Sequence, residues 1–195
     1  MKKDIILAGV GGQGILSIAT IIGVAALEEG LYLKQAEVHG MSQRGGDVQS
    51  NLRLSSDPIY SDLIAAGAAD MVVSLEPMEA LRYVGYLNPE SGWIITNTAP
   101  FVNITNYPEQ ASLEAALDAQ PRVVKFDMDQ AAKDISSPCS SNMVLLGACA
   151  PALGIAPEKL EDGIRKVFGP KGEKIVEANI TAFRHGLQAA QSQMK

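Results

Sequence analysis

The stretch Ile5-Ile6-Leu7-Ala8-Gly9-Val10-Gly11-Gly12-Gln13-Gly14-Ile15-Leu16-Ser17-Ile18-Ala19-Thr20 decides the fold. Its leading apolar residues predict a buried strand, and the loop that follows, 9–14, fits the pattern G-x-G-x-x-G. Residues 15–27 then predict a helix that is apolar around most of its circumference. Because such a helix must be covered on both sides, the chain begins with the strand–loop–helix unit of an α/β fold.

The rest of the chain predicts a single domain, residues 1–195, in which strands and helices alternate. A second strand at 31–36 follows within about 30 residues, the length of one βαβ unit. Strict alternation over 48–55 predicts a half-solvated antiparallel strand at a sheet edge. Further buried strands are predicted at 71–75, 93–96 and 123–126. The expected fold is therefore α/β: a Rossmann-like open, mostly parallel sheet with helices on both faces and an antiparallel edge strand.

The C-terminal third predicts three helices. The first, at 142–150, is expected to stop or kink at Pro151, and the second begins at Pro157 and ends near Gly169. The last carries one apolar stripe, formed by Val176, Ile180, Phe183 and Leu187. We expect this stripe to belong to the core, although it could also dock a partner.

Composition excludes several classes of protein. The chain has 195 residues, a formal charge of -6 and 47% apolar residues, which indicates a globular fold without the basic surface that nucleic-acid binding requires. The longest apolar run near the start, 14–27, is shorter than the roughly 20 residues that span a bilayer. The start also lacks the order of a signal peptide. We therefore expect a cytoplasmic protein with no nucleic-acid or membrane partner.

Cys139 and Cys149 are the only cysteines of the sequence. Two thiols are too few for the ligand set that usually holds an iron–sulfur cluster or a structural zinc ion, and too few for a disulfide framework. We therefore expect both to be reduced, helix-associated packing residues. Any redox centre must lie on another chain.

The glycine loop is the first candidate binding site. Its residues Gly9, Gly11, Gly12, Gln13 and Gly14 could bring backbone N–H groups close to a phosphate at the start of a helix. The alternative is that the glycines only form the turn.

A nicotinamide cofactor would also need an acidic residue about 20 positions on, and Glu37 fits that spacing. The polar loop and edge strand that follow do not continue a dinucleotide fold. An NAD-dependent oxidoreductase is therefore the weaker interpretation.

A polar loop follows the strand that Glu37 ends, and we expect it at the carboxyl edge of the sheet, where open α/β sheets bind ligands. Its candidate cleft or interface residues are His39, Met41, Ser42, Gln43, Arg44, Gly45 and Gly46. Arg44, beside two glycines, could present its guanidinium to a carboxylate or phosphate. The alternative is a turn whose arginine pairs with a nearby acid.

Two asparagines complete the candidate site. Asn97 follows a buried strand, so we expect it at the same edge, although ordinary loop chemistry explains it nearly as well. Asn142 precedes an apolar helix, where it is either an N-cap, the simpler reading, or a cleft residue.

In four segments the sequence resembles the gamma-type module of the 2-oxoacid:ferredoxin oxidoreductases. They are GVGGQG at 9–14, EVHGMSQRGGDV at 37–48, PIYS at 58–61 and NMVLLG at 142–147. The resemblance covers essentially the whole chain in order. The residues before Arg44-Gly45-Gly46 favour the arylpyruvate (indolepyruvate) branch, with a pyruvate-type or other 2-oxoacid branch as the alternative.

The resemblance implies a subunit of an enzyme that converts an arylpyruvate and coenzyme A into an aryl-acetyl-CoA, CO2 and reduced ferredoxin. Thiamine diphosphate, Mg and iron–sulfur clusters are then expected on a large (alpha) partner subunit, and no catalytic residue or metal ligand is expected here. Coenzyme A is expected as co-substrate, with the glycine loop as a possible phosphate site. The alternative of another class is a purely structural interaction subunit.

Overall fold

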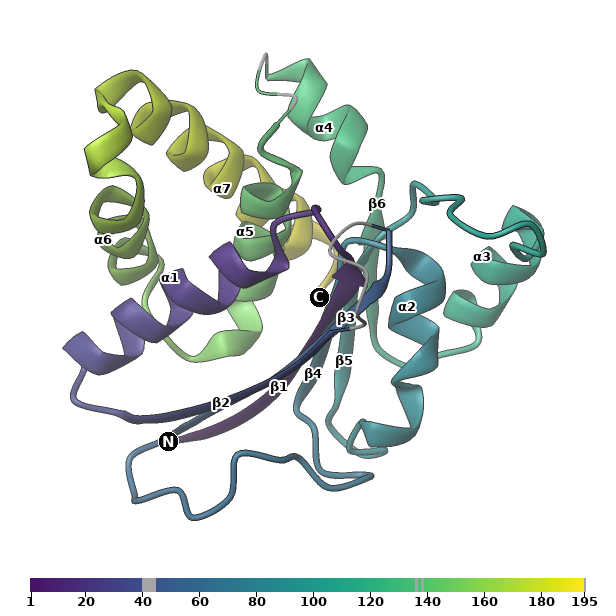
Figure 1. The fold of residues 1–195 in the computed structure, drawn as a ribbon, viewed down its shortest axis with the longest axis horizontal. Helices are drawn as coiled ribbons and strands as arrows, with labels where there is room; N and C mark the ends of the chain where they lie inside the picture. Colours follow the sequence, from purple (N-terminus) through teal and green to yellow (C-terminus); the bar gives the residue numbers. More distant parts are fainter. Residues whose placement is uncertain (40–44, 136, 138, 195) are drawn as a thin grey trace.

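The computed structural model describes residues 1–39, 45–135, 137 and 139–194. Within them, one sheet has the strand order β2-β3-β1-β4-β5-β6 (Figure 1). Its strands are β1 (Lys2–Val10), β2 (Tyr32–His39), β3 (Asp47–Ser55), β4 (Met71–Ser74), β5 (Trp93–Asn97) and β6 (Val123–Phe126). The helices are α1 (Ile15–Glu28), α2 (Pro77–Arg82), α3 (Gln110–Asp118), α4 (Met128–Asp134), α5 (Ser141–Leu153), α6 (Pro157–Phe168) and α7 (Glu173–Gln193), with short 3-10 turns η1 (Val84–Tyr86) and η2 (Gly169–Lys171).

The sheet is mostly parallel, as predicted. β1, β4, β5 and β6 pair in parallel, whereas β3 pairs antiparallel with both β1 and β2. The prediction that strand 48–55 is the edge strand is wrong, because β3 lies between β1 and β2 and the antiparallel edge is β2. The insertion of β3 also separates the first two strands of the expected βαβ unit.

The alternating pattern of β3 was misleading because its polar face is covered. Asn51 is buried and its Oδ1 accepts a hydrogen bond from the backbone N–H of Ile64 at 3.4 Å. Arg53 donates to the carbonyls of Ser61 and Leu63 at 3.0 and 3.1 Å. The loop after β3 thus supplies backbone partners to side chains that the sequence pattern assigned to solvent.

Helices cover both faces of the sheet, as predicted (Figure 1). One core cluster joins Ile5 and Leu7 of β1 to α1, α5, α6 and α7. A smaller cluster on the other face joins Ile6 and Ala8 to α2 and the segments around it. The alternating directions of the β1 side chains divide the core in this way.

The C-terminal helices follow the prediction, in which the first was expected to stop or kink at Pro151. α5 does not stop there but continues to Leu153 and ends at Gly154, whose φ of 75° is left-handed. The buried Leu153 side chain keeps this last turn in the core. The stripe on α7 is also core, because Val176, Ile180 and Phe183 are buried against it.

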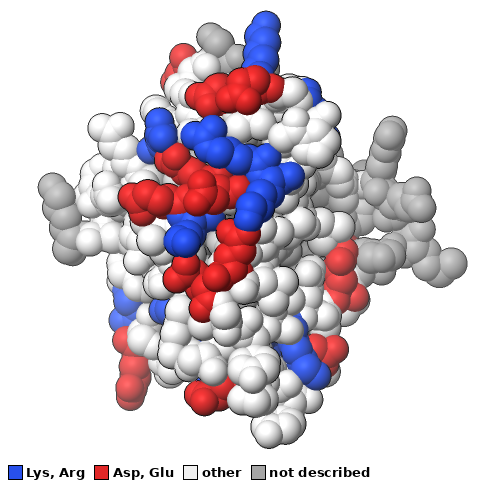
Figure 2. All heavy atoms as spheres, turned by 90° about the vertical axis from the view of Figure 1, so that its left-hand side faces the viewer, with Lys and Arg blue, Asp and Glu red and all other residues white. Residues whose placement is uncertain are grey.

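The outer face of α1, α6 and α7 carries charges of both signs, which alternate in Figure 2. Ion pairs there join Lys159 to Glu29 (3.1 Å), Lys166 to Glu28, Arg165 to Glu177 (3.3 Å) and Arg184 to Glu161 (2.7 Å). A surface with paired charges has no field of one sign to attract a phosphate backbone. In the described part of the chain, no helix is long and apolar enough to cross a membrane.

Candidate functional site at the carboxyl edge of the sheet

The glycine loop joins β1 to α1 as predicted, and its conformation requires glycine at two positions. Gly12 and Gly14 have φ angles of 103° and 83°, in the left-handed region. At Gly9, an added Cβ would lie 2.9 Å from both Gln13 Oε1 and Ile15 Cγ1. Part of the motif is therefore explained by the turn itself and by its packing.

Gln13 ties this loop to the sheet. Its Oε1 accepts a hydrogen bond from Val10 N at 2.7 Å, and its Nε2 donates to the carbonyl of Leu75 at 3.3 Å. Leu75 directly follows β4, so Gln13 links the carboxyl ends of two neighbouring strands. The side chain shapes the loop, and its second amide N–H is the group it has left for a ligand.

The glycine loop and the polar loop after β2 lie side by side. Gly11 N donates to the carbonyl of Gly46 at 2.8 Å, and Gly45 N donates to the carbonyl of Gly11 at 3.4 Å. The two stretches that sequence analysis selected separately therefore form one structure at the carboxyl edge. Because the N–H of Gly11 is already paired, any anion would have to use other backbone donors.

Met41, Ser42, Gln43 and Arg44, together with the side chain of His39, lie outside the described residues. Their expected roles therefore stay predictions.

Asn97 is buried and acts as a connector. Its Oδ1 accepts hydrogen bonds from Met128 N at 2.9 Å and Ala99 N at 3.2 Å, while its Nδ2 donates to Asp129 Oδ2 at 3.2 Å. Asp129 in turn accepts a hydrogen bond from Ser141 Oγ at 2.6 Å. The amide thus fastens the end of β5 to the starts of α4 and α5, which favours the loop-chemistry interpretation of Asn97.

Asn142 is not the N-cap of α5. The helix begins at Ser141 with Ser140 in the cap position, because a turn between Ser137 and Ser140 starts it earlier than the apolar pattern indicated. The Nδ2 of Asn142 instead lies 3.4 Å from the carbonyl oxygen of Gly14. An added Cβ at Gly14 would come within 2.7 Å of that nitrogen, so Asn142 brings the starts of α1 and α5 together.

These contacts surround a hollow of about 180 Å³. It is lined by Gln13, Leu75, Asp129, Cys139, Ser141 and Asn142. The starts of α1 and α5 favour negative charge nearby, but the Asp129 carboxylate in the wall opposes it. The hollow therefore suits a neutral group with hydrogen-bonding atoms better than a phosphate. Sequence analysis missed Asp129 and Ser141, although an acid in the first turn of a helix after a strand was a usable signal.

A second polar group lies at the same edge, around α2. The buried Glu76 carboxylate accepts hydrogen bonds from Glu79 N at 2.8 Å, from Phe101 N at 3.4 Å and from the Tyr107 hydroxyl. Burial raises the pKa of Tyr107, and its hydrogen bond to Glu76 raises it further. Burial also raises the pKa of Glu79, although Arg82 Nε lies 3.0 Å from its carboxylate and opposes the shift. These groups anchor the loop between β5 and α3.

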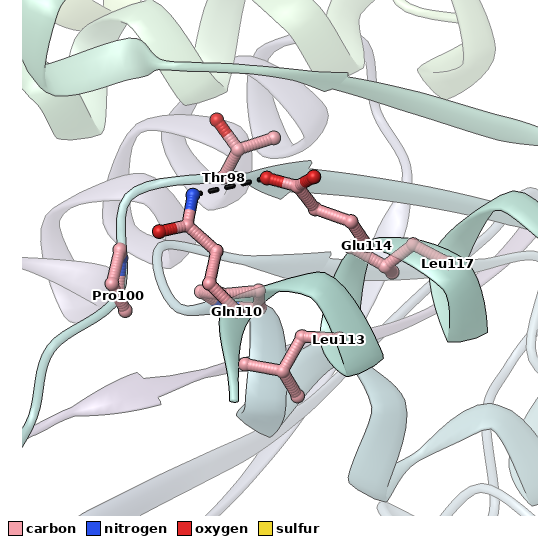
Figure 3. A pocket seen from close by; sticks show the side chains of 7 residues that line it. Thr98, Pro100, Gln110, Leu113, Glu114 and Leu117 are labelled. Carbon is pink, nitrogen blue, oxygen red and sulfur yellow. Dashed lines mark hydrogen bonds between the residues drawn. The ribbon is translucent and has the colours of Figure 1, made fainter. Parts of the chain in front are cut away.

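That loop exposes three large apolar side chains, Phe101, Val102 and Ile104. On its other side a narrow crevice runs along α3, and Figure 3 shows Gln110 and Glu114 turned toward each other below Thr98. Gln110 Nε2 donates to Glu114 Oε1 at 3.0 Å. The crevice has no space for a water molecule, so it is not a ligand site in this structure.

The two cysteines differ from each other. Cys149 is buried in α5 and burial raises its pKa, whereas Cys139 is exposed before α5, so the prediction that both are helix-associated packing residues is wrong for Cys139. Within the described ranges, no three His, Cys, Asp or Glu side chains gather in a way that could hold a metal ion. A protonated core thiol and one exposed thiol do not fit a cluster.

The position of Glu37 argues against a nicotinamide site. Glu37 pairs with Ser50 of β3, and β3 lies between it and β1. Neighbouring strands are about 4.8 Å apart, so Glu37 is displaced from the glycine loop by one strand more than an adjacent second strand would allow. Glu37 has the expected distance in sequence from the glycine loop, but the strand order places it too far away in space to support a nicotinamide site.

The comparisons with known proteins agree with this fold. The family model described as pyruvate ferredoxin/flavodoxin oxidoreductase matches residues 4–189. The proteins named indolepyruvate oxidoreductase subunit IorB in Thermococcus kodakarensis and Pyrococcus horikoshii are each 34% identical, over 100% of this chain and 99% of theirs.

Solved structures are similar as well. Pyruvate oxidoreductase subunit PORC from Thermotoga maritima has a TM-score of 0.73 at 21% identity, covering 96% of both chains. A 2-oxoglutarate:ferredoxin oxidoreductase from Magnetococcus marinus, with 2-oxoglutarate, coenzyme A and succinyl-CoA bound, has a TM-score of 0.77 at 24% identity and covers all of this chain but 32% of that one. The resemblance seen in the sequence is thus confirmed, and the chain belongs to the pyruvate ferredoxin/flavodoxin oxidoreductase family.

Proposed function

We propose that this chain is the small subunit of an indolepyruvate:ferredoxin oxidoreductase. The observation that carries the proposal is its 34% identity, end to end, to proteins named indolepyruvate oxidoreductase subunit IorB. The complex would convert an arylpyruvate and coenzyme A into an aryl-acetyl-CoA and CO2, and the released electron pair would pass to ferredoxin. A pyruvate-type substrate is the alternative within the same family.

The cofactors of this reaction belong to a large partner subunit in our proposal. Thiamine diphosphate with magnesium would stabilise the carbanion left by decarboxylation, and iron–sulfur clusters would carry the electrons. Two thiols are fewer than the ligand set that usually holds a cluster, and in the described ranges no three His, Cys, Asp or Glu side chains gather to hold a metal ion. Both observations support placing these groups on the partner. This chain's own contribution is to dock, to orient and to limit the access of water. The exposed free thiol of Cys139 fits a reducing compartment, so we place the complex in the cytoplasm.

The carboxyl edge is the surface that we propose docks on the large subunit. It exposes Phe101, Val102 and Ile104 on one loop and Leu16 at the start of α1. Exposed apolar side chains gathered at one place are typical of interaction sites. The opposite choice, the outer face of α6 and α7, carries charges that are already paired within the chain (Figure 2).

We also propose that the same edge helps to bind coenzyme A. The first turn of α1 has backbone N–H groups without partners inside the helix, and Arg44 adds a guanidinium expected nearby. Because Asp129 disfavours a phosphate in the hollow beside it, the phosphates would lie outside that hollow, against the first turn of α1.

The assembly is tested by co-expression with the large subunit of the same organism. The two chains should co-purify, and only the pair should reduce ferredoxin with indolepyruvate and coenzyme A. Turnover by this chain alone would reject the proposal. Replacing indolepyruvate by pyruvate or 2-oxoglutarate decides which branch of the family applies.

The coenzyme A role is tested separately, by titrating the assembled complex with coenzyme A. Arg44→Ala should weaken binding, whereas the control Arg184→Ala should not, because Arg184 is exposed on α7 and paired with Glu161. Equal affinities for all three proteins would reject the role.

A purely structural role is the second candidate, and the turn geometry favours it. Gly9, Gly12 and Gly14 each have a conformational or packing reason to be glycine, without any ligand. If the edge is only an interface, Arg44→Ala and Gly11→Ala should weaken co-purification of the two subunits and leave the affinity of the remaining complex for coenzyme A unchanged.

A further inference from the structure

Asn103 connects three loops at the carboxyl edge. It lies between β5 and α3, far in sequence from the glycine loop and from the polar loop after β2. Its Nδ2 nevertheless donates a hydrogen bond to the carbonyl of Gly45 at 2.8 Å. This contact joins residues that are 58 positions apart. Sequence analysis did not select Asn103, because nothing in its neighbourhood indicates where its side chain ends.

Gly45 is held through both of its backbone polar groups, the N–H and the carbonyl. Its N–H donates to the carbonyl of Gly11, while its own carbonyl accepts the Asn103 amide. The adjacent Gly46 carbonyl accepts the N–H of Gly11 at 2.8 Å. Gly45 has a φ of 78°, which glycine adopts readily and which a side chain would disfavour. Asn103 therefore fixes a left-handed glycine that pairs directly with the glycine loop.

The loop that carries Asn103 is itself anchored to the buried carboxylate of Glu76. The backbone N–H of Phe101 donates to Glu76, and so does the Tyr107 hydroxyl. Glu76 is fully buried at the start of α2. Asn103 lies between these two anchor points, so its amide is delivered to Gly45 from a fixed support.

We propose that Asn103 is a positioning residue for coenzyme A binding: it holds Gly45 and Gly46 against Gly11 and so sets the position of the glycine loop. The inference rests on the coenzyme A role in the proposed function. Asn103 itself need not touch the coenzyme. It acts through the backbone of Gly45, whose N–H donates to the carbonyl of Gly11.

The test uses the assembled complex and three variants. Asn103→Ala removes the side chain, and Asn103→Asp keeps its shape but removes the donor. The control is Asn106→Ala, on an exposed residue of the same loop. Two measurements are made: the KM for coenzyme A together with kcat, and hydrogen–deuterium exchange of the peptides that contain Gly11 and Gly45.

Both Asn103 variants should raise the KM for coenzyme A about threefold to tenfold, the fold-change expected for one net hydrogen bond, with kcat changed less than about twofold. Exchange should accelerate in the peptides with Gly11 and Gly45, and the control should match the parent. Unchanged exchange at Gly11 in both Asn103 variants would overturn the inference. Faster exchange with an unchanged KM would support the hold on Gly45 and reject instead the coenzyme A role of the proposed function.

Discussion

The contact between α5 and α7 offers the sharpest test of the fold. The two helices cross with their backbones close together at Gly147 and Gly186. An added Cβ at Gly147 would lie 2.8 Å from Leu187 N and overlap the carbonyl of Phe183, and an added Cβ at Gly186 would lie 2.7 Å from the carbonyl carbon of Val144. Since these are backbone atoms, no side-chain rotation can relieve the overlap. Gly147→Ala must push the helices apart.

The expected loss of stability follows from two opposing effects. Ordinary contacts begin at 3.4 Å, so a Cβ at Gly147 requires the two backbones to separate by about an ångström or more in a closely packed core. Overpacking costs about 1–3 kcal/mol and occasionally more, and because backbone atoms must move here we expect about 3–4 kcal/mol. Alanine favours the helix over glycine by about 1 kcal/mol, which offsets part of the loss. A net destabilisation of about 2–3 kcal/mol is expected, or a fall in Tm of roughly 4–12 °C for a chain of this size.

The assay is thermal unfolding and urea unfolding, each monitored by circular dichroism. Gly85→Ala is the matched control, because Gly85 is exposed in the short 3-10 turn η1 and has no atom within 4 Å of an added Cβ. It should keep or raise the Tm by a few degrees. If Gly147→Ala unfolds at the parent temperature or above, the close crossing of α5 and α7 is refuted. The reciprocal variant Gly186→Ala should behave like Gly147→Ala.

Three further predictions concern the titratable and reactive groups. In the native chain only Cys139 should react with an aromatic disulfide reagent, and Cys149 should react only after unfolding; two fast thiols in the native chain would contradict its burial. Burial raises the pKa of Glu79, so the folded state binds the proton of this carboxyl more tightly than the unfolded state does. Lowering the pH from the raised pKa to the ordinary pKa should therefore stabilise the parent relative to Glu79→Gln. Parallel curves of unfolding free energy against pH for the two proteins would count against this. Arg53→Met leaves the buried Asp4 carboxylate without the arginine whose Nε lies 2.7 Å away. The substitution should lower the free energy of unfolding in urea by about 3 kcal/mol and speed proteolysis of the loop after β3. An unchanged urea midpoint of unfolding would show that the pair contributes little.

The local elements of the fold could be predicted from the sequence because their signals are local. The first strand, the glycine loop and the first helix follow from apolar periodicity and glycine placement within 30 residues. The order of the strands could not be predicted, since the position of β3 beside β1 depends on a pairing that spans the whole hairpin. The alternating pattern of β3 predicted that its polar face contacts solvent. Asn51 and Arg53 instead have hydrogen-bond partners in the loop after β3, whose course the sequence does not show.

The sequence predicted where the candidate site residues lie in the fold, but not which residues they contact. The edge was correctly located from the strand ends, and Gln13, Asn97 and Asn142 do lie there. Their partners could not be foreseen: Asp129 is 32 positions from Asn97, and Asn142 is 128 positions from Gly14. The Glu76–Tyr107 contact spans 31 positions, and its sequence signal was an acid directly before the proline that begins α2.

The pattern of partners at the carboxyl edge bears on how the enzyme works. Gln13 and Asn97 donate hydrogen bonds to groups within the chain, and Asp129 accepts two, so these polar side chains hold the edge in shape. The groups left for a partner are of another kind: exposed apolar side chains on the loop after β5, and backbone donors at the start of α1. In the proposed complex, such an edge would be held in shape by its internal hydrogen bonds and completed as a binding site by the partner. The apolar loop would gain most from a partner surface. Because Asn103 ties that loop to Gly45, a subunit docked on it would be linked to the glycine loop through two hydrogen bonds. In the proposed complex, any factor by which docking changes the affinity for coenzyme A must therefore also be the factor by which coenzyme A changes the affinity between the subunits.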